Sequence, residues 1–197
     1  MDLISNKNIH WDYYIALEHD AERLSRYIEF SKNNLDTYSI ELTHLLITAA
    51  SEVDVVIKQL CYILSPDSKA STINEYHKVI EQMLPEIINT KIKSIRHDLT
   101  FQPWSSWESA DSPTWWRSYN KVKHERSSNF LKANLGNMLN ALSALFVVNV
   151  YLNHKVYEKL NSNLPFPMLV YLSSTLKKLT PQANLFRIDD PTLYLYD

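Results

Sequence analysis

Residues 112–129, "SPTWWRSYNKVKHERSSN", contain three side chains that together could bind or cleave a phosphodiester. Arg117 carries a planar, permanently charged guanidinium that suits phosphate oxygens. His124 can both accept and donate a proton near neutral pH. Asn120 places an amide between them. On one surface, these three groups would suit acid–base cleavage of a phosphate ester, with charge stabilisation by the arginine.

Helical geometry predicts that the three groups share a face. At about 100° per residue, Trp115, Tyr119 and Val122 form one apolar stripe, and the three polar side chains lie directly opposite. A surface helix places polar residues opposite its apolar stripe as a matter of course. A solvated face without a specific role is therefore the plainer interpretation.

The charge around this face favours an anionic partner. Residues 117–132 carry five basic side chains and one acid, a net charge of +4, in a chain whose total charge is -2. The basic residues are Arg117, Lys121, Lys123, Arg126 and Lys132. Basic clustering within an acidic protein suggests an anionic partner. We expect Lys121, Lys123, Arg126 and Tyr119 to contact that partner or its phosphates.

The composition predicts a soluble, cytoplasmic, all-α protein. The chain of 197 residues has one glycine, Gly136, which argues against hairpin-rich β folds and glycine-rich phosphate loops. A single cysteine, Cys61, excludes an internal disulfide framework and is expected in the core. No secretory signal is recognised near Asp2. The most apolar run, residues 139–152, is shorter than the roughly 20 residues of a membrane span.

Apolar spacing predicts an antiparallel bundle of four to five main helices within a single domain, residues 1–197. The expected ranges are 12–33, 38–64, 71–84, 112–126 and 132–160. Ser71 or Thr72 is expected to cap the third helix with Glu75 completing a capping box. Ser112 as N-cap and Pro113 at the first helical position predict the start of the fourth.

Two regions depart from the helical period. Residues 89–111 are expected to form a long ordered loop with a short strand near 92–101, held by Trp104 and Trp107. Loops of this length inside compact domains often have a function. The C-terminal tail, about 161–197, is expected to be partly extended, with a short helix near 168–179.

The motif residues resemble the HEPN superfamily. Arg117 and His124 in "RSYNKVKH" match its signature of an arginine followed, after four to six residues, by a histidine. The apolar "NLGNMLNALSALFVVNVYL" and the earlier "SEVDVVIKQL" also look like bacterial HEPN-type proteins. The resemblance covers about residues 38–155. It implies a helical bundle that dimerises through its motif helices and a metal-independent endoribonuclease of toxin–antitoxin or phage-defence systems, with no organic cofactor.

The resemblance also implies roles for the three polar residues. His124 would act as general acid or base on the RNA 2′-hydroxyl or the leaving oxygen, Arg117 would stabilise charge at phosphorus, and Asn120 would orient the phosphate or the imidazole. Active members usually have Asn, Asp or His directly after the motif arginine, where this chain has Ser118. The alternatives are a catalytically silent module that binds RNA, a nucleotide or a protein, and a purely structural helical dimer. A cognate antitoxin or nucleotidyltransferase is a candidate partner.

Spacing along the helix favours a homodimer. Arg117 and His124 are seven residues apart, which is about 10 Å along a helix axis. Two copies facing each other could surround one phosphate more easily than one copy could. Glu52, on an earlier helix, is a candidate support that would reach Lys121, Arg117 or Tyr119.

Other polar and aromatic residues have plainer explanations. Glu41 and His44 form one ExxH pair, whereas a di-iron bundle needs two pairs and two further glutamates, so no metal site is expected. Three asparagines at the start of the last helix could line the cleft beside His124, although such residues are more often caps. They are Asn134, Asn137 and Asn140. Trp104, Trp107 and Trp116 could stack on unpaired bases, but Trp104 and Trp115 are expected in the core.

Overall fold

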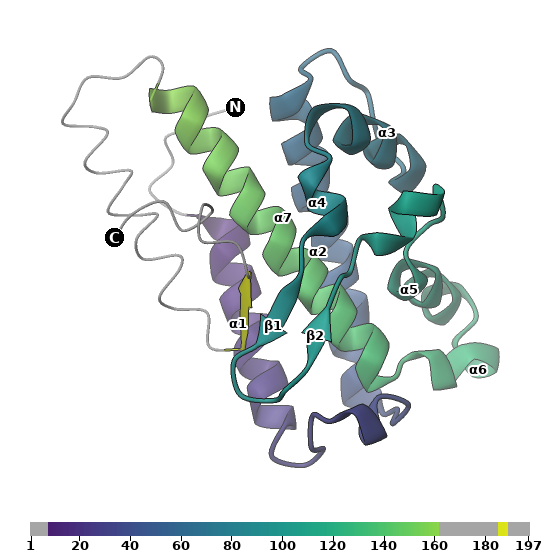
Figure 1. Cartoon of the computed structure of the whole chain (residues 1–197). Coiled ribbons are helices and arrows are strands. Elements are labelled where there is room, and N and C mark those ends of the chain that lie inside the picture. Colours follow the sequence, from purple (N-terminus) through teal and green to yellow (C-terminus); the bar gives the residue numbers. More distant parts are fainter. Residues whose placement is uncertain (1–7, 162–184, 189–197) are drawn as a thin grey trace.

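The computed structural model describes residues 8–161 and 185–188, and within them the chain is mostly α-helical (Figure 1). Five helices exceed two turns in this part of the chain, as the sequence predicts. The helices are α1 Ile9–Leu24, α2 Ile40–Leu64, α3 Ile73–Met83, α4 Glu86–Asn89, α5 Thr114–His124, α6 Arg126–Asn129 and α7 Leu135–Asn161. Short 3₁₀ helices lie between them at η1 Lys32–Asn34, η2 Ser105–Ser109 and η3 Phe130–Lys132.

Helices α2 and α7 form the centre of the bundle. They pack along each other, and α1 and α5 each contact both of them. In Figure 1, α1 and α5 lie on opposite sides of this central pair. Apolar side chains of α2 and α7, such as Leu46, Ile57, Leu145 and Val148, are fully buried. The near-continuous apolar character of α7 follows from contacts on several sides.

Helix α7 is long and apolar enough to cross a membrane by length and composition, although its most apolar run, residues 139–152, is shorter than a span. The segment Leu135–Lys159 is 25 residues long, and its most apolar 18-residue window has a mean hydropathy of 1.5. However, 78% of the most apolar window lies buried inside the protein. This burial is typical of the core helix of a soluble bundle, which passes the same test of length and hydropathy.

A small antiparallel sheet replaces part of the expected loop. Strand β1 (Ile92–Ser94) lies between β2 (Thr100–Phe101) and β3 (Phe186–Ile188). Ile92 is opposite Phe101 in one pairing and Ile188 in the other. The expected single strand near 92–101 is therefore a hairpin, and β3 confirms an extended segment within the tail. The helix expected near 168–179 lies outside the described residues.

Side-chain contacts determine where α1 ends and where α3 begins. Helix α1 ends at Leu24, well before the expected residue 33. The Ser25 hydroxyl donates to the Glu22 carbonyl oxygen at 2.7 Å, and the chain then turns to bury Phe30 at 2% exposure. At α3, Thr72 is the N-cap and exchanges capping-box hydrogen bonds with Glu75, as predicted.

The sole glycine lies where two backbone segments approach closely. Gly136 donates its N–H to the Leu35 carbonyl oxygen at 2.8 Å. A Cβ at this position would stand 3.3 Å from that same oxygen, which is tighter than usual contacts. The contact joins the segment before α2 to the start of α7, close to the end of α5.

Candidate functional site

A cluster of tryptophans attaches α5 to the loop before it. The Trp115 indole nitrogen donates to the Pro103 carbonyl oxygen at 2.8 Å, and its ring meets Trp104 edge-on at 5.4 Å between centroids. Trp104 in turn contacts Trp107 at 4.4 Å, and Trp107 stacks on His77 of α3. The loop is thus ordered by its tryptophans, as predicted, and it determines where α5 lies.

The start of α5 differs by one residue from the prediction. Pro113, not Ser112, precedes the first helical residue, and it offers no side-chain cap. The Ser112 hydroxyl instead donates to the Asn74 side-chain oxygen at 3.2 Å. The helix ends at His124, earlier than the expected Arg126, so its last turn is basic. Cationic side chains at a helix C-terminus are favoured by the helix dipole.

The predicted division of α5 into two faces is confirmed. Trp115, Tyr119 and Val122 are buried at 4% exposure or less, whereas Arg117 and His124 are exposed. Lys121 is exposed as well, and Asn120 is half-buried. We call the exposed residues Arg117, Lys121 and His124 the α5 face. Packing of the apolar stripe against α2 and α7 holds this face outward.

Hydrogen bonds within α5 occupy two of the polar side chains. An Arg117 guanidinium nitrogen donates to the Thr114 hydroxyl at 3.3 Å. The Asn120 amide donates to the Trp116 carbonyl oxygen at 3.2 Å, which is a bond one turn back along its own helix. Asn120 is therefore held close to the helix surface, between Arg117 and His124. Its expected role in orienting a phosphate or the imidazole stays a prediction.

Tyr119 supports a lysine rather than facing outward. Its ring is 4% exposed, and its hydroxyl accepts a hydrogen bond from Lys123 Nζ at 3.2 Å. The same ammonium lies 5.3 Å from the centre of the ring, within cation–π range. Burial of the ring does not support the expected direct contact between Tyr119 and RNA. The contact with Tyr119 instead fixes the ammonium of Lys123 beside the exposed face.

The expectation that Glu52 supports the α5 face is wrong. Nδ1 of His10 in α1 donates to the Glu52 carboxylate at 2.6 Å, and the Gln59 amide donates to the other ring nitrogen at 2.7 Å. Glu52 lies on the side of α2 that faces α1, so it joins the first two helices. Helical periodicity places Glu52 outside the core stripe but does not specify which neighbouring helix it meets.

Of the asparagines at the start of α7, one acts as a cap and two donate to backbone carbonyl oxygens nearby. The Asn134 side-chain oxygen accepts from the backbone N–H of Asn137 at 2.9 Å. Asn137 donates to the Lys132 carbonyl oxygen, and Asn140 donates to that of Gly136. All three side chains therefore satisfy backbone groups close by in sequence, as the plainer interpretation predicted.

Burial removes two tryptophans from the candidates for base stacking. Trp104 and Trp107 are 0% and 2% exposed. Trp116 is half-buried and contacts Tyr119 at 5.2 Å between centroids. Trp115 is buried too, which confirms the expected core role of Trp104 and Trp115. Of the three tryptophans expected to stack, only Trp116 keeps a partly exposed side chain.

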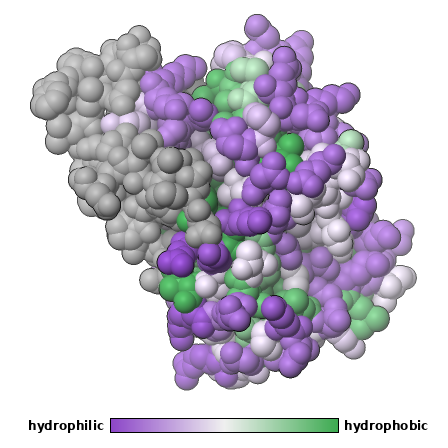
Figure 2. Space-filling view, in the orientation of Figure 1, coloured by the Kyte–Doolittle hydropathy of each residue, from purple (hydrophilic) through white to green (hydrophobic). Residues whose placement is uncertain are grey.

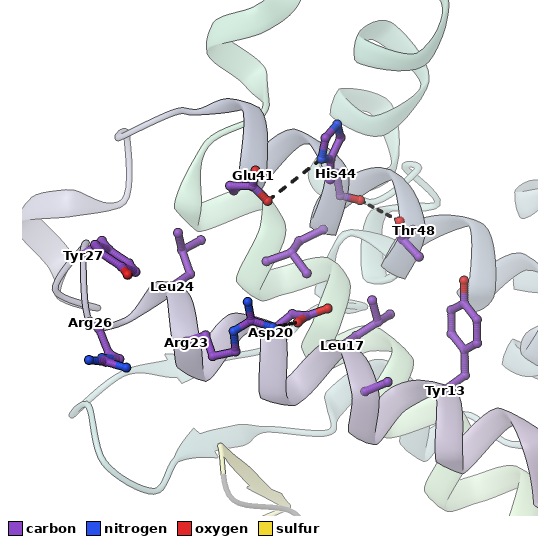
Figure 3. A pocket seen from close by; sticks show the side chains of 12 residues that line it. Tyr13, Leu17, Asp20, Arg23, Leu24, Arg26, Tyr27, Glu41, His44 and Thr48 are labelled. Atoms are coloured by element: carbon purple, nitrogen blue, oxygen red, sulfur yellow. Dashed lines mark hydrogen bonds and ion pairs between the residues drawn. The ribbon is translucent and has the colours of Figure 1, made fainter.

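A groove of about 620 Å³ lies between α1 and α2, away from α5 (Figure 3). Tyr13 and Tyr27 lie at its two ends, and Leu17 and Leu45 are among the residues that line it. Figure 3 also shows the Glu41–His44 pair on the α2 side of the groove. These two side chains are 4.0 Å apart and more than 60% exposed. An exposed ion pair of this kind contributes little to stability and does not form a catalytic arrangement.

The described part of the chain contains neither a cluster of metal-binding side chains nor a reactive thiol. Within residues 8–161 and 185–188, no three His, Cys, Asp or Glu side chains lie close enough together to hold a metal ion. Cys61 is buried, and burial raises the pKa of its thiol to about 12. The thiol is therefore protonated at neutral pH, and Cys61 is a core residue, as predicted.

Sequence reasoning missed an exposed aromatic group near the end of α5. Tyr38 is 45% exposed, and its ring meets Phe130 edge-on at 5.3 Å. Leu131, the residue that follows Phe130, is 64% exposed. One signal was present in the sequence, because Phe130 and Leu131 interrupt the basic run between Arg126 and Lys132. The contribution of Tyr38, 92 residues earlier, is visible only in the tertiary structure.

No protein-family model, curated protein or solved structure matches this chain. The HEPN resemblance therefore depends on the motif and its helical setting alone.

Proposed function

We propose that this chain is a HEPN-like protein that binds RNA through the α5 face and cleaves it as a homodimer, without a metal ion. The observation that carries the proposal is the outward orientation of Arg117, Lys121 and His124 together. A buried stripe on the same helix holds all three toward solvent. An exposed cationic face with a histidine at its end suits a phosphodiester.

The chemistry would be transfer of the phosphate to the neighbouring 2′-oxygen. The 2′-hydroxyl loses its proton to a base as its oxygen attacks phosphorus, and the bond from phosphorus to the 5′-oxygen breaks. The leaving 5′-oxygen takes a proton from an acid. His124 would serve as the base or the acid, and Arg117 would stabilise the extra negative charge on the phosphate oxygens.

A second copy would complete the site. Arg117 and His124 are seven residues apart, about 10 Å along the axis of one helix. In a homodimer with two α5 faces opposed, the arginine of one copy and the histidine of the other could meet at one phosphate. Two histidines would then be present, one for each proton transfer.

A second candidate function is binding without cleavage. Ser118 takes the position where active HEPN proteins usually have Asn, Asp or His, and its side chain is 7% exposed on the inner side of α5. A buried hydroxyl there cannot contact a substrate. This observation favours a module that recognises RNA, a nucleotide or a protein through the same face.

The proposed setting follows from the resemblance. A HEPN-like ribonuclease of the toxin–antitoxin or phage-defence type would act in the cytoplasm. A cognate antitoxin or nucleotidyltransferase would hold it inactive until it is needed. The basic α5 face would be the surface that such an inhibitor covers, because covering it blocks RNA.

An RNA cleavage assay in EDTA tests the enzyme proposal. Purified wild type is compared with His124→Ala and Arg117→Ala on mixed RNA. The matched controls are His44→Ala and Arg26→Ala, which change an exposed histidine on α2 and an exposed arginine just after α1. We expect cleavage by wild type and both controls, and a loss of at least about 100-fold in the α5 variants.

Binding measurements decide between the two candidates. Affinity for RNA is measured against salt concentration, with Lys121→Ala compared with Lys58→Ala on α2. Removing one phosphate contact should reduce the slope of log affinity against log salt by about 0.7 for a single strand. Salt-sensitive binding that needs Arg117 and Lys121, without cleavage, would favour the binding module. If no variant of the α5 face alters binding or cleavage, both candidates are wrong.

A further inference from the structure

An apolar and aromatic surface adjoins the end of the α5 face. It consists of Tyr38, Phe130 and Leu131, which we call the 38/130 surface. Tyr38 and Leu131 are 45% and 64% exposed, and Phe130 is half-buried against Tyr38. In Figure 2, apolar atoms are visible at the lower right edge, where α6 lies in Figure 1, with hydrophilic residues around them.

Backbone contacts hold the 38/130 surface in place. Tyr38 forms a β-bridge with Asn134, and the N–H of Leu135 donates to the Thr37 carbonyl oxygen at 2.8 Å. The close approach of Gly136 to Leu35 reinforces the same junction. Tyr38 comes directly before the N-cap of α2, whose Ser39 hydroxyl accepts from the N–H of Leu42. The tyrosine is therefore fixed at the meeting point of α2 and α7.

The surroundings of this surface are basic. Phe130 and Leu131 belong to η3, which packs against α5, and η3 ends at Lys132. Arg126 begins α6 on the other side. A chain of phosphates along the α5 face would pass His124 at the end of the helix and reach Arg126. Tyr38, whose ring contacts Phe130 of η3, would then face the bases that these phosphates carry.

We propose that the 38/130 surface is a stacking subsite for an unpaired base of a single-stranded RNA whose phosphates lie on the α5 face. This inference rests on the proposed function and adds the class of substrate, a single strand. Exposed aromatic rings beside a cationic groove stack on bases of any sequence. Bases in an RNA duplex are already stacked and paired, so they cannot reach a ring on a protein surface.

Two of the three tryptophans expected to stack on bases, Trp104 and Trp107, are unavailable for that role because they lie in the core. Tyr38 takes their place as an exposed ring beside the basic segment. A partner protein would be a poorer occupant, because the 38/130 surface is bordered by Arg126 and Lys132. Their positive charge complements the phosphates of RNA.

Binding of one fluorescent RNA of about 12 nucleotides tests the subsite, since a single site of this kind spans about 4–16 nucleotides. The strand is measured alone and annealed to its complement, with wild type, Tyr38→Ala and Tyr38→Phe. Tyr62→Ala is the matched control, because Tyr62 is 52% exposed on α2. We expect Tyr38→Ala to weaken single-strand binding about tenfold. Tyr38→Phe and the control should bind as wild type does, and duplex binding should be equal in all four.

Leu131→Ala gives a second measure that preserves the aromatic pair. Because its side chain is 64% exposed, the fold should not depend on it, and single-strand affinity should fall by a few-fold. The salt slope should stay unchanged in all three variants of the surface, since no phosphate contact is removed.

Three outcomes would overturn the inference, and each is distinguishable. If Tyr38→Ala binds the single strand as wild type does while Lys121→Ala binds less, only the stacking subsite is wrong. If Tyr38→Ala changes the oligomeric mass and leaves RNA affinity unchanged, the surface is a protein interface. If wild type shows no salt-sensitive RNA binding, the proposed function fails and the subsite fails with it.

Discussion

The carboxylate of Glu18 accepts a hydrogen bond at 2.9 Å from the backbone N–H of Leu185, 167 residues further along the chain. Glu18 is 0% exposed and also accepts from the Tyr14 hydroxyl at 2.7 Å. A buried carboxylate is costly unless hydrogen bonds satisfy it. Glu18 therefore connects α1 to the residue that precedes β3, the described strand of the tail.

Replacing Glu18 by alanine should destabilise the protein strongly. The Leu185 N–H would lose its acceptor inside the core, at about 1–3 kcal/mol for a group left unsatisfied, and Tyr14 would lose its hydrogen bond to Glu18. Urea unfolding of Glu18→Ala measures the loss. Glu22→Ala, four residues later on the same helix and only half-buried, should cost far less. Equal losses in both variants would show that Leu185 does not depend on Glu18.

Trp115→Phe should weaken the attachment of α5 to its loop. Phenylalanine keeps most of the ring contact with Trp104 but cannot donate to the buried Pro103 carbonyl oxygen. We expect the free energy of unfolding to fall by about 1–3 kcal/mol. Denaturant unfolding provides the measurement, and Trp116→Phe at the next, half-buried position is the comparison. A neutral Trp115→Phe would mean that ring packing alone orients α5.

The capping box of α3 should contribute a pH-dependent part of the stability. Hydrogen bonds from the backbone N–H of Ser71 and the side chain of Thr72 lower the pKa of Glu75. The contribution of the Glu75 carboxylate to stability is therefore complete above the ordinary carboxyl pKa. It is lost as the pH falls through the lower pKa that Glu75 has in the folded state. Thr72→Ala should cost about 1 kcal/mol at neutral pH.

Unfolding of Glu75→Gln at neutral pH and at about pH 3 tests the carboxylate itself. The difference from wild type should be present at neutral pH and should shrink in acid, as the pH falls toward the lowered pKa of Glu75 in the folded state. A difference that stays constant would show that its charge does not contribute.

His97 should make the protein less stable in mild acid. Burial lowers the pKa of His97, against the opposing attraction of Glu29 at 4.0 Å. Below the ordinary histidine pKa of about 6.5, the unfolded state therefore binds a proton more readily than the folded state. Stability falls as the pH drops through this range.

Urea unfolding at about pH 7.5 and about pH 5.5, on either side of that value, measures the effect. Between these two pH values, wild type should lose more stability than His97→Gln loses. His19→Gln, which changes an exposed histidine on α1, should behave as wild type does. If His97→Gln has the same pH dependence as wild type, the proton uptake belongs to other groups, such as His154, whose pKa burial also lowers.

Local periodicity and capping residues were sufficient to predict the main helices and the two faces of α5. Residues one turn apart on a helix share a face whatever surrounds them, so Trp115 and Tyr119 are predicted to be buried, and Arg117 to be exposed, from spacing alone. The Thr72–Glu75 box is local for the same reason. The end of α1 was misplaced because Phe30 is drawn into the core, which is a tertiary contact.

Contacts between distant segments were decided only by the tertiary structure. Glu52 meets His10 rather than α5, and Tyr38 meets Phe130, because both pairs depend on which helices become neighbours. Periodicity gives the direction of a side chain relative to its own axis but not the identity of the group it reaches. By itself, the sequence therefore determined the basic face that could bind a phosphate. The packing of α2 and α7 decided which aromatic ring stands beside it.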